Sequence, residues 1–265
     1  MHAVRQPAVA GTFYPGDQHE LVRLVDTQLD AARAALPPDA VAPKAVLVPH
    51  AGYVYSGSTA ALAYARLELA RDRIERVVLL GPTHREPVRG LAVSGSRVWR
   101  TPLGEVGTEE HLPGLDTLHH VVTSPDVHRW EHSLEVQVPF LQRVLGGFTL
   151  VPLAVGEATP HEVGEALEAL WGGPETVVVV SSDLSHYHPY DEAGRLDRET
   201  VTRILALDGP IDPDRACGAR PLNGLLEAAS RHALAPRLLG LCNSGDTAGD
   251  RHRVVGYAAV AFEEE

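Results

Sequence analysis

Three side chains that can bind metal ions each follow an apolar run of the kind that forms a buried strand. His50 follows VLVP, His84 follows VVLLGPT, and Asp183 follows VVVVSS. Histidine nitrogen and carboxylate oxygen are common metal ligands in proteins. Because the carboxyl ends of strands in an open parallel sheet form one rim, we expect the three side chains to share a site there. One such histidine alone would more simply be a hydrogen-bonded loop residue, so the prediction rests on all three strand ends.

The segment SSDLSHYH places His186 three residues after Asp183. A carboxylate beside an imidazole can orient the ring and raise its basicity, which suits acid–base catalysis. We therefore predict that Asp183 and His186 are catalytic residues and that Asp183 orients His186. The alternative is a capping network in which Ser182 or Asp183 accepts hydrogen bonds from helix N–H groups.

The segment WEHSLEVQVPFL is dense in polar and aromatic side chains, and it begins with Glu131 and His132. We predict that His132 lines the site as a third catalytic residue and that Glu131 supports the site from behind. Glu135 lies three residues after His132. The two could form a metal-binding His-x-x-Glu pair, or Glu135 could be an ordinary acid in the first turn of a helix.

Cys217 lies in RACGARPLNG, shortly before a predicted helix. A thiol near a helix N-terminus has a lowered pKa, so Cys217 is predicted to be available as a thiolate for a metal or for redox chemistry. A single free cysteine can equally be a small buried hydrophobe. Cys242 in LGLCNSGD has apolar neighbours and is predicted to serve packing alone.

The elements that must position these side chains alternate along the chain. The apolar periodicity predicts helices over 19–36, 56–70, 133–145, 160–171, 191–207 and 221–234, and strands over 45–50, 76–84, 90–94, 149–155, 176–183 and 254–262. Strands that are apolar on both sides and alternate with helices indicate a largely parallel sheet with helices on both faces. The sequence shows no repeat or long linker, so we predict a single domain over residues 1–265.

Composition excludes several classes of protein. With 44% hydrophobic and 22% charged residues the chain is globular, and a net charge of −12 argues against a nucleic-acid surface. Two cysteines cannot form a disulfide framework, the N-terminus lacks the pattern of a secretory signal, and no window approaches the ~20 apolar residues of a membrane span. We expect a cytoplasmic protein. The GxGxxG, Walker, GxSxG, CxxC and HExxH motifs are missing as well.

Seven separated segments together carry a resemblance to a known family. They are RQPAVAGTFYPG, PHAGYVYSG, LGPTH, RTPLGEV, EHSLEVQVPFL, SSDLSHYH and ACGARPL, in this order. The chain resembles the Memo family, whose bacterial and archaeal members are called AmmeMemoRadiSam system protein B. This resemblance implies the fold of class III, LigB-type extradiol dioxygenases, which is a three-layer α/β/α arrangement around a mostly parallel or mixed sheet of about seven strands.

The resemblance also implies a set of metal ligands. The family's histidines in the PHAGY and GPxH segments and its cysteine correspond to His50, His84 and Cys217 here, with Asp183 and His186 in the same pocket. Iron or copper is the expected metal, and zinc is an alternative. Cys217 stands where the dioxygenases have a carboxylate ligand, and a thiolate is softer and itself oxidisable, so cleavage of catechols does not follow from the fold.

Three functions are compatible with these residues. The first is a metal-dependent redox or oxygenase-like enzyme with an unknown small-molecule or peptide substrate, in which His132 and Tyr53 shape the pocket. The second is a non-catalytic protein that binds a peptide or phospholigand in the same pocket. The third, implied by the family resemblance, is an accessory role beside a radical-SAM protein and an AMMECR-type protein.

Overall fold

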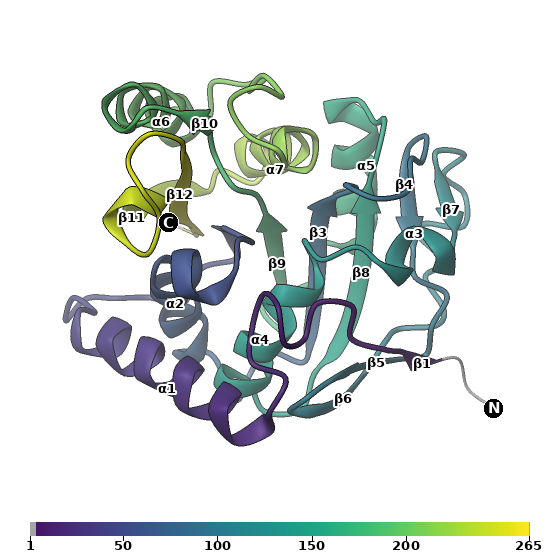
Figure 1. The fold of residues 1–265 in the computed structure, drawn as a ribbon. Coiled ribbons are helices and arrows are strands. Elements are labelled where there is room, and N and C mark those ends of the chain that lie inside the picture. Colours follow the sequence, from purple (N-terminus) through teal and green to yellow (C-terminus); the bar gives the residue numbers. More distant parts are fainter. Residues whose placement is uncertain (1–3, 265) are drawn as a thin grey trace.

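The computed structural model describes residues 4–264, which form a three-layer α/β/α fold around a nine-stranded mixed sheet (Figure 1). The strands of this sheet are β2 (Ala45–Val48), β3 (Arg76–Pro82), β4 (Leu91–Val93), β7 (Val121–Thr123), β8 (Thr149–Val155), β9 (Thr176–Ser181), β10 (His186–His188), β11 (Ala235–Asn243) and β12 (Val254–Glu263). Their order is β10-β12-β2-β9-β3-β8-β4-β7, and β11 pairs with β12. The central strands β2, β9, β3 and β8 are parallel, whereas β12 and β4 join them antiparallel.

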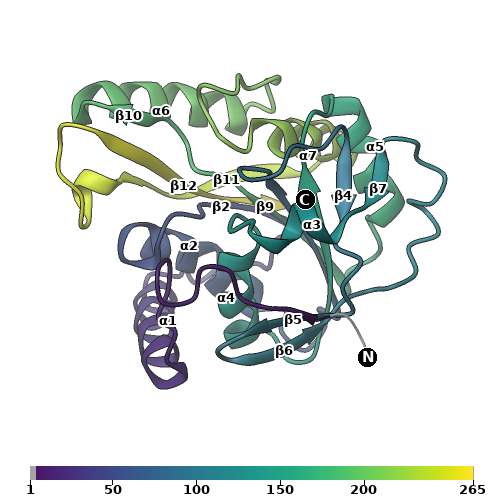
Figure 2. The same ribbon diagram turned by 45° about the vertical axis from the view of Figure 1, so that its right-hand side comes forward.

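Helices cover both faces of this sheet (Figure 2). On one face lie α1 (Gln18–Ala34), α2 (Tyr53–Glu68) and α4 (Val138–Val144), and on the other lie α5 (Pro160–Leu170), α6 (Tyr190–Leu205) and α7 (Ala219–Arg231). Short helices α3 (Pro125–Arg129), η1 (Glu135–Gln137) and η2 (Ser244–Asp246) lie in the connections. A separate three-stranded sheet consists of β1 (Val4–Arg5), β5 (Val98–Thr101) and β6 (Gly104–Gly107).

Alternation along the central strands explains why two cores form. In β2, Val46 and Val48 pack into the core below α1, α2 and α4, while Ala45 and Leu47 pack into the core below α5, α6 and α7. Successive side chains of a strand point to opposite faces, so a strand buried on both sides must be apolar throughout. The continuous apolar runs of the sequence therefore correctly predicted the three layers.

The sheet is wider than the about seven strands that we expected. β11 is the largest addition, and the sequence did not predict it because Pro236 and Gly240 are unusual within a strand. Both are tolerated because β11 lies at the edge of the sheet, where it pairs with β12. The predicted helix over 133–145 is also interrupted: Pro139 lies in the first turn of α4, and the preceding turn is the 3₁₀ helix η1.

Within residues 4–264, every helix is too short or too polar to span a lipid bilayer.

Candidate metal centre

The strands that precede His50, Asp183 and His84 are immediate neighbours in the sheet. β2, β9 and β3 lie side by side and run parallel, with Val48 in register with Ser181. Their carboxyl ends therefore deliver the three side chains to one rim, as the sequence predicted. The Asp183 carboxylate accepts a hydrogen bond of 2.7 Å from the backbone N–H of His50, so it fixes the turn that carries this histidine.

Cys217 reaches the same rim from the connection between α6 and α7. Its N–H donates to the carbonyl of Asp183 at 3.3 Å, and the N–H of Gly218 donates to Ser182 Oγ at 2.8 Å. A Cβ atom at Gly218 would lie 2.6 Å from the Ser181 carbonyl oxygen and 2.6 Å from Ser182 Cβ. Only glycine permits this close approach, which holds the thiol against the strand ends.

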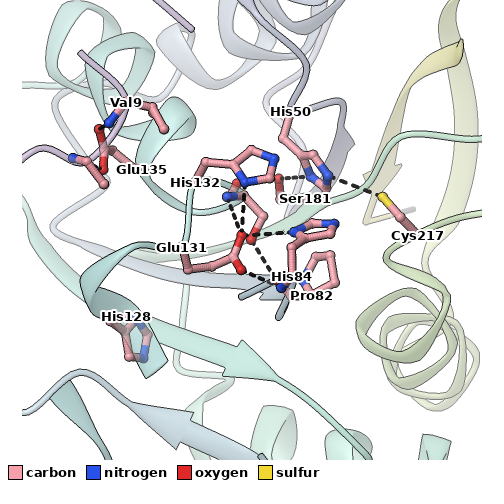
Figure 3. A network of polar contacts seen from close by, with 12 residues as sticks. Val9, His50, Pro82, His84, His128, Glu131, His132, Glu135, Ser181 and Cys217 are labelled. Carbon is pink, nitrogen blue, oxygen red and sulfur yellow. Dashed lines mark hydrogen bonds and ion pairs between the residues drawn. The ribbon is translucent and has the colours of Figure 1, made fainter. Parts of the chain in front are cut away.

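Hydrogen bonds fix the tautomer of His50. The hydroxyl of Ser181 has one hydrogen, which it donates to the carbonyl of Ser133 at 2.6 Å, and it accepts from Gln137 Nε2 at 2.8 Å. The 2.9 Å contact of His50 Nδ1 with this hydroxyl is therefore one in which Nδ1 donates. The lone pair of His50 Nε2 is left facing Cys217 Sγ at 3.2 Å (Figure 3).

A buried carboxylate orients His84 in a similar way. Glu131 accepts from the backbone N–H of His84 at 2.5 Å, from His84 Nδ1 at 2.9 Å and from the N–H of Ser133 at 2.9 Å (Figure 3). Burial alone would raise the pKa of Glu131, but the hydrogen bond and charge of His84 and the two backbone N–H groups lower it to about 2. The ionised carboxylate keeps the proton on Nδ1 and leaves Nε2 of His84 free as a ligand.

The donor atoms of His50, His84 and Cys217 all lie within 4.8 Å of one another. A metal ion bound at about 2.0–2.1 Å from nitrogen and about 2.3 Å from sulfur holds its ligands roughly 3.5 Å apart, close to the 3.2 Å between His50 and Cys217. Burial, and then the nearby His84 and His132, lower the pKa of His50 far below its usual value, so its ring is neutral and able to coordinate. These residues fit a metal ion.

Glu131, His84 and His132 form a second group of close donor atoms, but it differs in kind. Both oxygens of Glu131 already accept hydrogen bonds from His84, and one also accepts from Ser133. His132 Nδ1 lies 3.3 Å from the same carboxylate without hydrogen-bond geometry. This second group is a hydrogen-bonded support for the first.

Known proteins resemble this chain over nearly its whole length. The family profile described as Memo-like protein matches residues 5–261. The chain belongs to the Memo family. It is 38% identical to a MEMO1 family protein of Aquifex aeolicus, over 98% of this chain and 99% of that protein. Comparable relatives are the MEMO1 family proteins of Aeropyrum pernix, at 38% identity over 97% and 99%, and of Ignicoccus hospitalis, at 39% over 98% of each chain.

A cavity of about 750 Å³ opens over the donor atoms of this Memo family protein. Its lining includes the predicted residues His50, His84, His132, Asp183, His186 and Cys217. The six side chains come from five separate segments of the sequence, and the structure brings them around one cavity. The sequence did not single out the aromatic and charged residues of its walls, which are Phe13, Tyr187, Tyr257, Asp214, Asp250 and Arg253.

Contacts within the cavity correct the predicted pairing of Asp183 with His186. His186 Nδ1 donates to the carbonyl of Leu184 at 2.8 Å, whereas the Asp183 carboxylate is taken up by the backbone of His50. A backbone carbonyl, not a carboxylate, therefore orients His186 and leaves its Nε2 unprotonated. Burial raises the pKa of Asp183 to about 7, despite the hydrogen bond from His50, so this carboxyl can exchange a proton near neutral pH.

The predicted low pKa of Cys217 is wrong. Burial, and then the negative charge of Asp183, raise the pKa of this thiol to about 12. The thiol lies before α7, whose N-cap is Gly218, but removal from water outweighs the attraction of the helix terminus. Cys217 is therefore a thiol in the absence of a cation, and a bound metal ion would have to displace its proton.

One further expectation is wrong, and one alternative that the sequence left open is decided by burial and hydrogen bonding. Tyr53 does not shape the cavity, since its ring is buried against Phe140 and its hydroxyl donates to the carbonyl of Val136; Tyr55 lines the cavity instead. Glu135 does not join His132, because its carboxylate is fully buried and holds Arg5 at 2.7 Å. The supporting residues Ser181 and Gln137 were missed because nothing in a local sequence pattern reveals a hydrogen bond between distant segments.

Proposed function

We propose that this chain is a metal-dependent redox protein that acts on a small molecule bound in the cavity. The observation that supports this most directly is the convergence of two imidazole rings and one thiol, whose donor atoms lie within 4.8 Å of one another beside a cavity of about 750 Å³. Cavities of this size suit small molecules better than extended peptides.

His50, His84 and Cys217 would hold the ion. The fixed hydrogen bonds from His50 to Ser181 and from His84 to Glu131 keep each ring in the orientation and tautomer that coordination needs. Two imidazoles and a thiolate suit iron(II), copper(I) or zinc, and iron or copper would supply one-electron chemistry with dioxygen as oxidant. With three protein ligands, a bound ion would keep a coordination position for a substrate or dioxygen.

Proton transfer would fall to His186 and Asp183. His186 Nε2 is free to accept a proton from a substrate hydroxyl or amine, because Nδ1 is tied to Leu184. Asp183, with its pKa of about 7, can pass a proton at the same rim. Burial lowers the pKa of His132 to about 4, so this ring presents a neutral wall beside the ligand histidines.

Metal content tests the proposal. Protein purified without oxygen is expected to carry close to one equivalent of iron or copper by elemental analysis, and Cys217→Ala should lose most of it. Cys242→Ala is the matched control, because Cys242 contacts Thr59 at 3.0 Å and lies outside the cavity lining in the described residues. Full metal retention in Cys217→Ala, or equal loss in both variants, would exclude Cys217 as a ligand. Partnership with a radical-SAM protein and an AMMECR-type protein stays a prediction from the family.

A further inference from the structure

The chain has one buried ammonium group, far from the candidate metal centre. Of its 23 lysine and arginine residues, Lys44 is the only lysine. It is 6% exposed and immediately precedes β2, at the amino ends of the parallel strands whose carboxyl ends carry the metal centre. Lysine is almost never this buried unless a partner replaces the water that the ammonium has lost.

Backbone carbonyl oxygens replace this water. Nζ of Lys44 donates to the carbonyls of Trp171 at 2.7 Å, Gly173 at 2.8 Å and Thr176 at 2.8 Å, and the carbonyl of Gly172 lies at 3.5 Å. These four oxygens form a carbonyl cage. Three short contacts need three N–H donors, which an ammonium has and a neutral amine lacks. Lys44 is therefore protonated, although burial lowers its pKa.

The end of α5 and the turn after it supply the cage. α5 ends at Leu170, and the last carbonyls of a helix have no partner within the helix and carry its partial negative charge. Gly172 has φ of +58°, a left-handed conformation that turns the chain directly after the helix. The last turn of α5 has no basic side chain of its own. The cation that these carbonyls favour comes instead from Lys44.

The cage consists of uncharged oxygens. Among residues 4–264, the hydrogen bonds of the Lys44 ammonium all go to backbone carbonyls, while Glu175 and Glu264 attract it through charge alone. The face of the Trp171 ring lies 5.3 Å from Nζ and adds a cation–π contact. Potassium is bound in the same way where backbone carbonyls replace its hydration shell. The cage therefore suits a monovalent cation of the size of ammonium or potassium.

We propose that the carbonyl cage is a monovalent-cation site, which the Lys44 ammonium fills as a tethered ion. Without this side chain the site accepts potassium or ammonium from solution. The tethered ion joins the start of β2 to the turn before β9, two strands that pair in parallel from Ala45 and Val178 onward. It thereby holds their register from the end opposite the metal centre, so this proposal does not rest on the proposed function.

Urea unfolding of Lys44→Ala in different chloride salts at equal ionic strength tests the proposal. Potassium or ammonium should lower the unfolding equilibrium constant by the factor 1 + [cation]/Kd, which is about tenfold at ten times Kd. Tetramethylammonium is too large for the cage and should have no such effect, and the native protein should respond alike to all three salts. Equal stability of Lys44→Ala in potassium and tetramethylammonium would overturn the proposal.

Two further variants at the same position separate the cage from general effects of salt and charge. Lys44→Met keeps a long side chain that blocks the cage, so it should be less stable than the native protein and show no preference for potassium. Lys44→Arg keeps the charge, but a planar guanidinium does not direct its donors as a compact ammonium does, so it should also lose stability. A potassium preference in Lys44→Met equal to that of Lys44→Ala, or native stability in Lys44→Arg, would refute the site.

Two measurements keep the proposal testable if Lys44→Ala is unfolded in tetramethylammonium. Its refolded yield from urea should then rise in potassium, and failure to refold in every salt would contradict a site that an external cation can fill. In the native protein, acetylation followed by mass spectrometry reports on the single lysine. Lys44 should react more than about tenfold more slowly in the folded than in the urea-unfolded protein. Equal rates would show that the cage does not hold the ammonium.

Discussion

Two buried glutamates four residues apart, Glu131 and Glu135, accept hydrogen bonds from different parts of this protein and have different roles. Glu131 and Glu135 are both almost fully buried, at 1% and 0% exposure, and each accepts several hydrogen bonds. The donors to Glu135 are Arg5, Tyr14 and the N–H groups of Ala8 and Val9, all from the N-terminal segment. The donors to Glu131 include the ring of His84, which also faces the cavity.

The difference lies in whether a hydrogen-bond donor to the carboxylate has a second polar atom that faces the cavity. The partners of Glu135 use their polar atoms for hydrogen bonds inside the protein. The Glu135 carboxylate therefore holds the N-terminal segment in place. His84 has a second ring nitrogen, so the hydrogen bond to Glu131 orients a side chain that also lines the cavity. Burial and hydrogen bonding alone therefore do not identify a functional site; an unused donor or acceptor that faces a cavity does.

The largest expected effect is on stability at Glu135. Glu135→Gln removes the charge that neutralises Arg5, which is itself only 5% exposed, and should lower the free energy of unfolding by about 3–5 kcal/mol. Urea unfolding measures this. Glu105→Gln, in an exposed pair with Arg100, should cost less than about 1 kcal/mol. Similar losses in the two variants would show that the Glu135 cluster does not hold the N-terminal segment.

A pH effect is expected from the same region. Arg5 donates to the carbonyl of His128, whose ring is 1% exposed, and burial lowers the pKa of His128 to about 4. Its folded-state pKa lies below the unfolded value, so the unfolded chain binds the extra proton between pH 6.5 and 4. Stability should therefore fall as pH falls through this range, by up to about 3 kcal/mol from this residue.

His128→Gln provides the comparison, because an amide can still donate to the Ala92 carbonyl that His128 contacts at 2.8 Å. Urea unfolding at pH 7 and pH 5 should give a smaller decrease for this variant than for the native protein. Parallel pH dependence in the two proteins would mean that other histidines account for the effect.

The features that the sequence predicted depend on residues close together in the chain, whereas the features that it missed depend on contacts between distant segments. The apolar runs before His50, His84 and Asp183 gave the central strands and their shared rim, because burial on both faces dictates composition residue by residue. β10 and β11 were missed, since a bulge at Tyr187 and an edge position for Pro236 are consequences of pairing with β12.

The same distinction between local and distant residues applies to the candidate metal site. Residue types that coordinate metals stood at recognisable places, but their supports came from elsewhere in the chain. Nothing near Ser181 predicts that it accepts from Gln137, and nothing near His186 predicts that Leu184, and not Asp183, holds its ring. The pKa of Cys217 was mispredicted for the same reason, because a helix start is visible in sequence and burial by distant segments is not.

The smallest of these effects concerns Glu131, and it sharpens the contrast with Glu135. Glu131→Gln keeps an oxygen that can accept from His84 Nδ1 but loses the charge that favours this tautomer. Metal affinity should therefore fall about 10- to 100-fold, the usual effect of removing a carboxylate that orients a ligand histidine. Competition with a chelator of known affinity measures this. Glu135→Gln, measured where it is still folded, should bind metal like the native protein, because none of its described side-chain partners is a ligand. Loss of metal in Glu135→Gln and not in Glu131→Gln would reverse the roles of the two carboxylates.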